Sequence, residues 1–345
     1  MRLCAGFVCQ SPRGRVGLYR ESGASHPRRT VHRFNSVACV QSAVHCGLRH
    51  CRAWQRHRAA AYLSRPRAGA RTHERQRINV AEGISLGPLF LRWNGVLIAL
   101  GISAGALLAG YETKRRGGDP EIIYYLLPPL IGWGLIGARL WHIFTPPLSS
   151  VQLGLTTGHY LTHPLDMLAL WIGGLGIPGA LLGGTFGLFL FSRKHELPFW
   201  QLTDLLAPGL ALAQTIGRVG NYFNQELYGL PANVPWAILI QPDHRLIGYE
   251  EIEYYHPLFA YEVLMNIMNV ALLLWLSRKF FHQLQAGDLF LAYLLFYSAV
   301  RFLLEFLRLD VALMAGVNAN QAFFAVLFVI AGGVLYRRHR FAREL

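Results

Sequence analysis

Three arginines stand at the ends of long apolar segments, where a charged side chain is costly. Arg139 and Arg218 each end such a segment, and Arg301 lies near the end of another. On insertion scales a cation at the centre of a bilayer costs about 2.5–3.5 kcal/mol, so an arginine near that depth needs an anionic partner. Guanidinium groups bind phosphate through paired, charge-assisted hydrogen bonds. The arginines therefore predict a site for an anionic lipid headgroup.

Polar side chains accompany these arginines at helical spacing. Residues three, four or seven positions apart share one face of a helix. A simpler interpretation is that the arginines reach toward the lipid headgroups and pair with nearby acids. The sets that share a face are Arg301 with Glu305 and Arg308, Glu262 with Asn266 and Asn269, and, if the helix continues past Arg218, Arg218 with Asn221, Tyr222 and Gln225.

The elements that would position these side chains are membrane helices. The chain of 345 residues is 53% hydrophobic and only 15% charged, with a mean hydropathy of +0.28. Soluble domains are nearer one quarter charged, and disordered chains have few large apolar residues. The sequence therefore predicts an all-α, polytopic membrane bundle of about seven transmembrane helices. The predicted spans are 93–111, 122–144, 177–192, 201–217, 259–277, 287–307 and 319–336.

Basic residues and glycines indicate how these spans are oriented and packed. Basic clusters follow the first, third, fifth and seventh predicted spans, at 114–116, 193–194, 278–279 and 337–340. Basic loops favour the cytoplasm, so the N-terminus is expected outside and the C-terminus in the cytoplasm. The arginine positions then lie at the outer end. Glycines recur in the first three spans, which indicates close approach between helices.

Residues 1–77 differ from the rest of the chain. They hold 16 Arg, no Lys, two acids and all five cysteines, whereas the remainder is neutral. The segment could be an arm for nucleic acid or anionic lipid, a transit peptide, or sequence translated upstream of the true start. Arginine without lysine favours the third interpretation. A zinc site formed by the cysteines is a further alternative, although their spacing is not C-x2-C. We expect residues 1–80 to be a disordered or spurious extension and residues 81–345 to form the seven-span domain.

Several motifs resemble one known family. The run GRVGNYFNQELYG at 217–229 closely resembles the signature of bacterial prolipoprotein diacylglyceryl transferases, and it is the most specific match. The other motifs follow in the family's order over about residues 86–336. They are GARLWHIF at 137–144, WIGGLGIPGALLGG at 171–184, VPWAI at 234–238, HPLFAYE at 256–262, RFLLEFLR at 301–308 and the pair Asn320-Gln321.

The resemblance implies an enzyme of the bacterial inner membrane. Family members transfer the diacylglyceryl group of phosphatidylglycerol to the lipobox cysteine of a preprolipoprotein signal peptide, and release glycerol phosphate. No metal, organic cofactor or nucleic-acid partner is expected. The catalytic residues implied here are Arg218, Arg301, His256 and Glu226, and the residues implied to bind phosphatidylglycerol are Arg218, Asn221, Gly229, Arg139 and Arg301.

The sequence departs from the family pattern at two positions. Pro178 stands where many members have a histidine, and Asn94 stands where many have a tyrosine. A free thiol is only slightly ionised at neutral pH, so a base or a strong positive potential would help the reaction. His256 is the nearest remaining candidate base, with His142 behind it. Two alternatives stay open: a lipid or solute transporter, and a catalytically inactive relative that binds an anionic headgroup.

Overall fold

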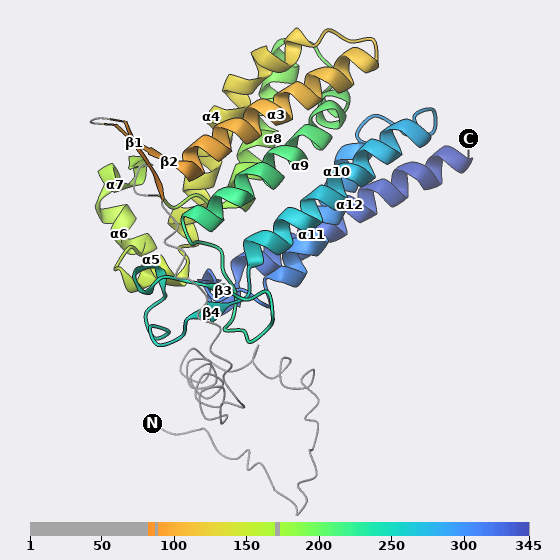
Figure 1. Cartoon of the computed structure of the whole chain (residues 1–345). Coiled ribbons are helices and arrows are strands. Elements are labelled where there is room, and N and C mark those ends of the chain that lie inside the picture. The colour runs from red at the N-terminus through yellow and green to blue at the C-terminus, as the bar shows by residue number, and fades with distance from the viewer. Residues whose placement is uncertain (1–81, 87–88, 170–172, 345) are drawn as a thin grey trace, which may run out of the picture. The chain divides into compact units, whose positions relative to one another are not determined.

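The computed structural model describes residues 82–86, 89–169 and 173–344. The expected N-terminal extension at 1–80 lies outside these residues. The described part is mostly helical (Figure 1). A long helix occupies each of the predicted spans. Their bounds are α3 Trp93–Arg115, α4 Glu121–Phe144, α8 Ile177–Lys194, α9 Phe199–Phe223, α10 Leu258–Lys279, α11 Asp288–Leu304 and α12 Ala319–Glu344.

Short elements connect the long helices. The antiparallel pair β1 (Gly83–Leu86) and β2 (Leu89–Arg92) leads directly into α3. The helices α5 (Leu148–Gln152), α6 (Thr157–Thr162) and α7 (Pro164–Leu168) lie between α4 and α8. The loop between α9 and α10 carries β3 (Ile238–Leu239), η2 (Pro242–His244) and β4 (Tyr254–Tyr255). The hairpin of β5 (Leu313–Met314) and β6 (Val317–Asn318) precedes α12.

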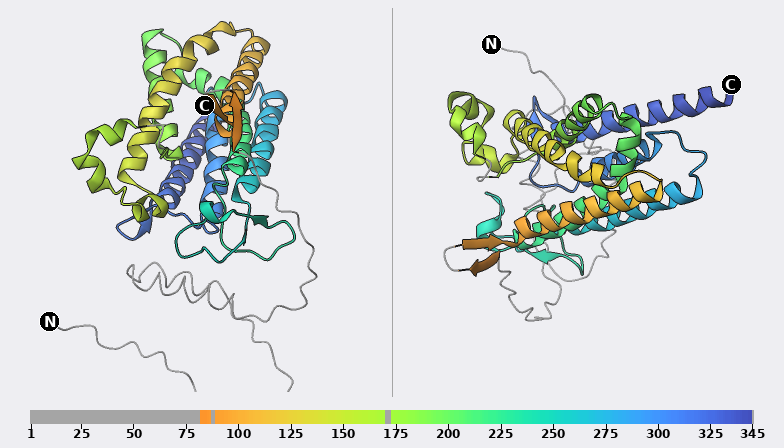
Figure 2. Two further views of the ribbon diagram at one scale, coloured as in Figure 1. Left: turned by 60° about the vertical axis from the view of Figure 1, so that its left-hand side comes forward. Right: turned by 90° about the horizontal axis from the view of Figure 1, so that it is seen from above.

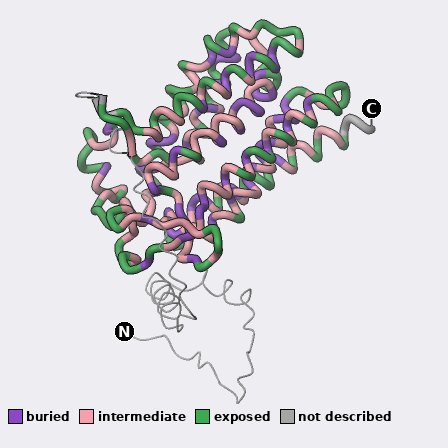
Figure 3. The backbone as a smooth tube through the Cα atoms, viewed as in Figure 1, coloured by how far each residue is buried: buried purple, intermediate pink, exposed green. Residues whose placement is uncertain are grey.

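Among the described residues, four helices are long and apolar enough to cross a membrane. They are α3, α4, α10 and the part of α12 at Ala319–Arg340. Long stretches of these helices are exposed or only partly buried (Figure 3). The exposed residues include large apolar ones, among them Leu107, Leu264 and Val329. A water-soluble protein would bury such faces, so this pattern fits a multi-pass membrane protein.

Two helix pairs are held by glycine contacts, as the glycine pattern predicted. Helix α4 packs along α8, and α3 packs along α9 (Figure 2). A Cβ added to Gly137 would lie 2.2 Å from the carbonyl oxygen of Gly179, and one added to Gly105 would lie 2.5 Å from that of Gly209. Both distances are too short for a side chain. The helices therefore meet backbone to backbone, in the way that small residues permit in membrane bundles.

The remaining long helices form a core around two stacked tyrosines. Tyr293 and Tyr297 lie one turn apart on α11, with ring centroids 5.7 Å apart, and both are buried. Phe324 of α12 meets Tyr297 edge on. The prolines inside α4 and α9 do not end these helices. Packed neighbours in a bundle compensate for the hydrogen bonds that such prolines remove.

Candidate active site

Glu262 joins two of the predicted arginines inside the bundle. It lies in the second turn of α10 and is 1% exposed. Its Oε2 lies 2.6 Å from Nε of Arg218 on α9, and its Oε1 accepts a hydrogen bond from Nη1 of Arg301 on α11. A buried carboxylate is stable only when it is paired, and here one carboxylate serves two cations. The structure thus brings Arg218 and Arg301 to the same end of three helices.

A second carboxylate extends this group. Arg301 Nη2 lies 3.5 Å from Glu305 Oε2, and Arg308 Nη1 lies 3.6 Å from the same atom. The predicted shared face of Arg301, Glu305 and Arg308 is therefore formed, although α11 itself ends at Leu304. We call Arg218, Arg301, Arg308, Glu262 and Glu305 the arginine cluster. Its three cations and two anions leave one positive charge to attract an anionic ligand.

A cavity of about 500 Å³ borders the arginine cluster. Side chains of α3, α4, α8 and α9 line it, and most of them are apolar. Arg218, Asn221 and Asn94 form a polar end, whereas Arg301 and Glu262 are not part of the lining. Arg218 is therefore the member of the cluster that faces the cavity. A polar end joined to a long apolar wall suits a ligand with a charged headgroup and acyl chains.

The signature run changes from helix to turn after Phe223. Helix α9 continues past Arg218 to Phe223, so Arg218, Asn221 and Tyr222 lie on the helix. Gln225 follows the helix with φ of 51°, and its Oε1 accepts a 2.6 Å hydrogen bond from the backbone of Gln241. The expectation that Gln225 shares the face of Arg218 is therefore wrong, because the backbone turns into a left-handed conformation first.

Glu226 reaches Arg218 through an amide side chain. Arg218 Nη1 donates to Asn221 Oδ1 over 3.2 Å, and Asn221 Nδ2 donates to Glu226 Oε2 over 3.4 Å. Asn224 also donates to Glu226. The Glu226 carboxylate is exposed, and it binds the same Asn221 amide that accepts from Arg218. Asn94 packs against Gly220 of the same run, where a Cβ would lie 2.3 Å from Asn94 Oδ1.

Gly229 fixes the end of the signature run against α10. Its N–H donates to the carbonyl oxygen of His256 over 2.8 Å. A Cβ at this position would lie 2.1 Å from Cδ1 of Leu258 and 2.7 Å from the carbonyl oxygen of Leu307. Only a residue without a side chain fits between these groups. Gly229 therefore holds the signature run close to His256 and to the end of α11.

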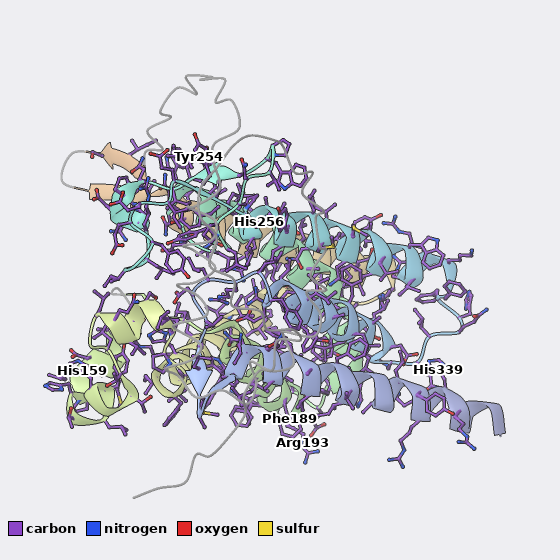
Figure 4. The ribbon with its side chains drawn as sticks, turned by 90° about the horizontal axis from the view of Figure 1, so that it is seen from below. His159, Phe189, Arg193, Tyr254, His256 and His339 are labelled. Atoms are coloured by element: carbon purple, nitrogen blue, oxygen red, sulfur yellow. The ribbon has the colours of Figure 1, made fainter. Side chains whose placement is uncertain are left out.

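His256 precedes α10 and lies at the end of the bundle opposite His339 (Figure 4). Its Nδ1 lies 3.0 Å from the hydroxyl of Tyr261, which accepts a 2.7 Å hydrogen bond from the indole N–H of Trp236. Burial lowers the pKa of the His256 imidazole below its ordinary value. The ring is therefore neutral at pH 7, which is the form that a general base requires.

Arg139 is used differently from Arg218. Its guanidinium donates to four backbone carbonyl oxygens, those of Asp166, Met167, Gly173 and Gly174, at 2.6 to 3.2 Å. It also lies over the ring of Tyr160. Arg139 thus holds the segment that leads from α7 toward α8. The prediction that it also contacts phosphatidylglycerol stays a prediction.

The residues at the two variant positions and the second histidine have packing roles here. Pro178 is buried in the first turn of α8, a position that proline favours because its missing N–H has no helical partner there. Asn94 lines the cavity. His142 is buried, with Nε2 3.3 Å from the Tyr160 hydroxyl, beside the Arg139 contacts.

Sequence reasoning missed the central part played by Glu262. The spacing placed it on a face with Asn266 and Asn269, and all three are buried. The spacing did not reveal that Arg218 and Arg301 converge on it, because the three residues come from three different helices. An available signal was the buried charge itself, since a carboxylate in an apolar helix needs cationic partners.

These features define a multi-pass membrane protein with a largely apolar cavity that has an arginine at its polar end. A sequence profile described as prolipoprotein diacylglyceryl transferase matches residues 82–337. The chain belongs to this family. A phosphatidylglycerol–prolipoprotein diacylglyceryl transferase of Synechococcus elongatus is 39% identical over 255 residues, which cover 73% of this chain and 84% of the relative.

Two further relatives carry the same description of activity. The one from Streptomyces coelicolor is 40% identical over 229 residues, covering 66% of this chain and 69% of the relative. The one from Halalkalibacterium halodurans is 35% identical over 264 residues, covering 76% of this chain and 86% of the relative. The profile match at 82–337 covers the long helices from α3 through most of α12, and the positions of the arginine cluster lie within it.

Proposed function

We propose that this protein transfers the diacylglyceryl group of phosphatidylglycerol to the lipobox cysteine of a preprolipoprotein. The thiol sulfur forms a bond to the terminal glycerol carbon of the diacylglyceryl group. The bond from that carbon to the phosphate oxygen breaks, glycerol phosphate leaves with the electron pair, and the thiol proton is released. The observation that carries this proposal is Arg218 at the polar end of an apolar cavity, inside a matched family signature.

Arg218 is the residue we assign to the phosphate. A guanidinium has five N–H bonds. Among the described residues, Arg218 contacts Glu262, Asn221 and the Tyr297 hydroxyl. N–H bonds remain for a phosphate at the cavity. Positive charge fixed in a water-poor site stabilises the negative charge that develops on the leaving oxygen, which is how such a residue accelerates the reaction.

The other site residues act around Arg218. Arg301 supplies positive potential from behind Glu262, since it is 2% exposed and does not line the cavity. Asn221 and Glu226 orient Arg218 from the rim. Gly229 sets the position of the signature run. The cavity between α3, α4, α8 and α9 accepts acyl chains of the lipid.

His256 is the proposed base for the substrate thiol. The Tyr261 oxygen can accept a hydrogen bond from the Nδ1–H of His256, which leaves Nε2 free to take a proton. The lowered pKa keeps the imidazole neutral at physiological pH. The arginine cluster assists by favouring the thiolate, because nearby positive charge lowers the pKa of a thiol.

We further propose seven spans, with the arginine cluster at the outer side of a bacterial inner membrane. The C-terminal ends of α3, α8, α10 and α12 carry the basic clusters. In support, Arg115 of α3 contacts Ser277 of α10, and His339 of α12 contacts Asp288 at the start of α11, at helix ends away from the arginine cluster. Basic residues favour the cytoplasmic side, so the C-terminus is cytoplasmic and the chain entering α3 is outside.

The test uses purified full-length protein in phosphatidylglycerol vesicles with a peptide that contains a lipobox cysteine. We expect the intact mass of the peptide to rise by one diacylglyceryl group, and the same peptide with serine in place of cysteine to stay unmodified. A transporter would instead move labelled lipid across sealed vesicles and leave the peptide mass unchanged. Binding of phosphatidylglycerol without any adduct would point to an inactive relative and contradict the proposal.

A further inference from the structure

A second cavity lies at the end of the bundle opposite the arginine cluster. Its volume is about 360 Å³, and it forms where α3 ends, α9 begins and the chain passes from α10 to α11. Its polar lining includes Arg116, Gln201, Asp204, Ser277 and Gln285. It does not share a lining residue with the cavity that borders Arg218. The proposed transfer reaction makes no use of it.

Arg116 presents an unused donor at this second cavity. Its Nε is buried and has no hydrogen-bond partner among the described residues, while its Nη2 donates to Ser277 Oγ over 3.3 Å. A buried donor left without an acceptor costs about as much as a lost hydrogen bond. A group that brings an acceptor oxygen into the cavity would remove this cost.

The nearby carboxylates are committed to other partners. Glu112 pairs with Arg115 at 2.8 Å. Asp204 accepts hydrogen bonds from the backbone N–H groups of Gly287 at 2.6 Å and Phe290 at 2.9 Å. Neither carboxylate lies within ion-pair distance of Arg116. Both carboxylates favour the charge of Arg116 from a distance, but neither supplies an acceptor to its Nε, so an oxygen for that donor has to come from another group.

The surroundings favour a phosphate. The last residues of α3 and α10 and the residue after α3 contribute five basic side chains to this end, namely Lys114, Arg115, Arg116, Arg278 and Lys279. The carboxylates packed against them are Glu112, Asp204 and Asp288, and Asp288 pairs with His339 at 2.8 Å. The five basic side chains outnumber these three carboxylates, and two further, exposed carboxylates, Asp119 and Glu121, follow in the turn after α3 and at the first residue of α4. The other cavity wall is apolar, with Leu205, Phe281 and Leu289, and suits the carbon part of a phosphate ester.

We propose that the second cavity binds a phosphate group held by Arg116. The phosphate belongs either to the headgroup of an anionic phospholipid in the leaflet at this end or to a free phosphate. In both cases the anion accepts from Arg116 Nε and adds the acceptor that the fold does not provide. The amide groups of Gln201 and Gln285 border the same space and can donate to further phosphate oxygens.

The experiment uses full-length protein that carries Arg218→Ala. This variant removes the arginine proposed to bind the lipid phosphate in the cavity between α3, α4, α8 and α9. One arm titrates inorganic phosphate and follows the phosphorus-31 line width, and the other adds phosphatidylglycerol and counts bound lipid by native mass spectrometry. Binding in the first arm identifies free phosphate as a ligand, and binding in the second arm alone identifies the lipid headgroup. We expect Arg116→Ala to weaken binding about tenfold or more.

The control is Lys114→Ala, which removes a charge at the same end from an exposed residue outside the cavity lining. We expect it to change binding by no more than about twofold, because exposed charges are screened. If Arg116→Ala does not fold, Gln201→Trp keeps Arg116 and fills the cavity from its exposed rim, and it should abolish binding. Absence of binding in both arms, or binding that these cavity variants leave unchanged, would show that the cavity holds only water.

Discussion

Arg139 and Arg218 lie in different helix pairs of the bundle and use their guanidinium groups differently. Arg139 of α4 is 5% exposed and donates to four backbone carbonyl oxygens. Arg218 of α9 is 15% exposed and borders a cavity, with contacts to Glu262 and Asn221. The two residues stand at similar places in the sequence pattern. They differ in how many guanidinium N–H donors the fold leaves without a protein acceptor.

This comparison shows how a fold can leave some donors of a partly buried arginine unused. A guanidinium surrounded by carbonyl oxygens is satisfied and acts as a structural link. A guanidinium held by a carboxylate on one side keeps its orientation and can still donate on the other side. Preorganised donors of this kind are what a site needs in order to stabilise charge in a transition state.

The largest expected effect separates these two arginines directly. Arg218→Ala should reduce kcat/KM for lipid transfer about 100-fold or more, because the phosphate loses its fixed donor, while Arg301 keeps Glu262 paired. Arg139→Ala should instead lower the melting temperature in detergent, because four partly buried carbonyl oxygens lose their donor and the segment from α7 to α8 loses its link to α4. Transfer kinetics and tryptophan-monitored unfolding of both variants provide the measurements.

Equal effects of the two variants on transfer and on stability would contradict the distinction between Arg139 and Arg218. Arg139→Ala with intact stability and a loss of transfer as steep as that of Arg218→Ala would place Arg139 in contact with substrate. Arg218→Lys is a useful intermediate variant, because lysine keeps the charge and loses the paired geometry. We expect it to recover only a small part of the activity.

A smaller effect is expected from Glu262→Gln. The amide cannot offset the repulsion between Arg218 and Arg301, so Arg218 should shift away from the cavity. We expect kcat to fall about 10–100-fold, since small displacements of a catalytic group have effects of this size. Glu262→Asp keeps the charge and should recover part of kcat. Equal activity of both variants and the unaltered protein would show that Glu262 does not position the arginines.

A still smaller effect concerns pH. The neutral form of His256 is the active one, and burial lowers the pKa of its imidazole. Activity should therefore persist at acidic pH and fall only as the pH drops through a value below that of an ordinary histidine. His256→Gln should lower the rate and remove this acidic limb from the profile of kcat/KM against pH. An unchanged limb in His256→Gln would assign it to another group.

The smallest expected effect is that of deleting residues 1–77. The family profile begins at residue 82, and the described helices begin at Trp93. We expect the shortened chain to insert and to transfer lipid at the same rate, within about twofold. Membrane fractionation and the transfer assay provide the measurement. A loss of insertion or of activity would show that the basic segment has a role of its own.

The positions of the long helices followed from the apolar pattern, because a bilayer requires long runs of apolar residues. The glycine contacts between helices, Gly137 with Gly179 and Gly105 with Gly209, which we call the glycine seams, also followed from the sequence. Small residues mark close contacts between helices in membranes. The short strands did not. Each pair has two to four residues per strand and no alternating pattern long enough to detect, so β3 with β4 and β5 with β6 became visible only in the structure.

The sequence allowed single residues of the candidate site to be predicted, but it did not allow their arrangement in space to be predicted. Charge in an apolar segment marked Arg218 and Arg301, and their convergence on Glu262 depends on how α9, α10 and α11 pack. Spacing along one helix cannot show this. The same limit applies to Arg139, whose donors are satisfied by carbonyl groups some 27 to 35 positions away in the chain. Backbone carbonyl groups carry no mark in a sequence.

The glycine seams have a mechanical consequence for the entry of a lipid. Where Gly137 meets Gly179, and Gly105 meets Gly209, backbone meets backbone with no side chain between, so we expect each helix pair to move as one unit. The cavity is lined by both units. Rocking of one unit against the other would widen it by rearranging leucine and isoleucine side chains, and would leave each seam closed. Bulky residues in a seam should thus deform a whole unit, and bulky residues at the cavity wall should only narrow the passage.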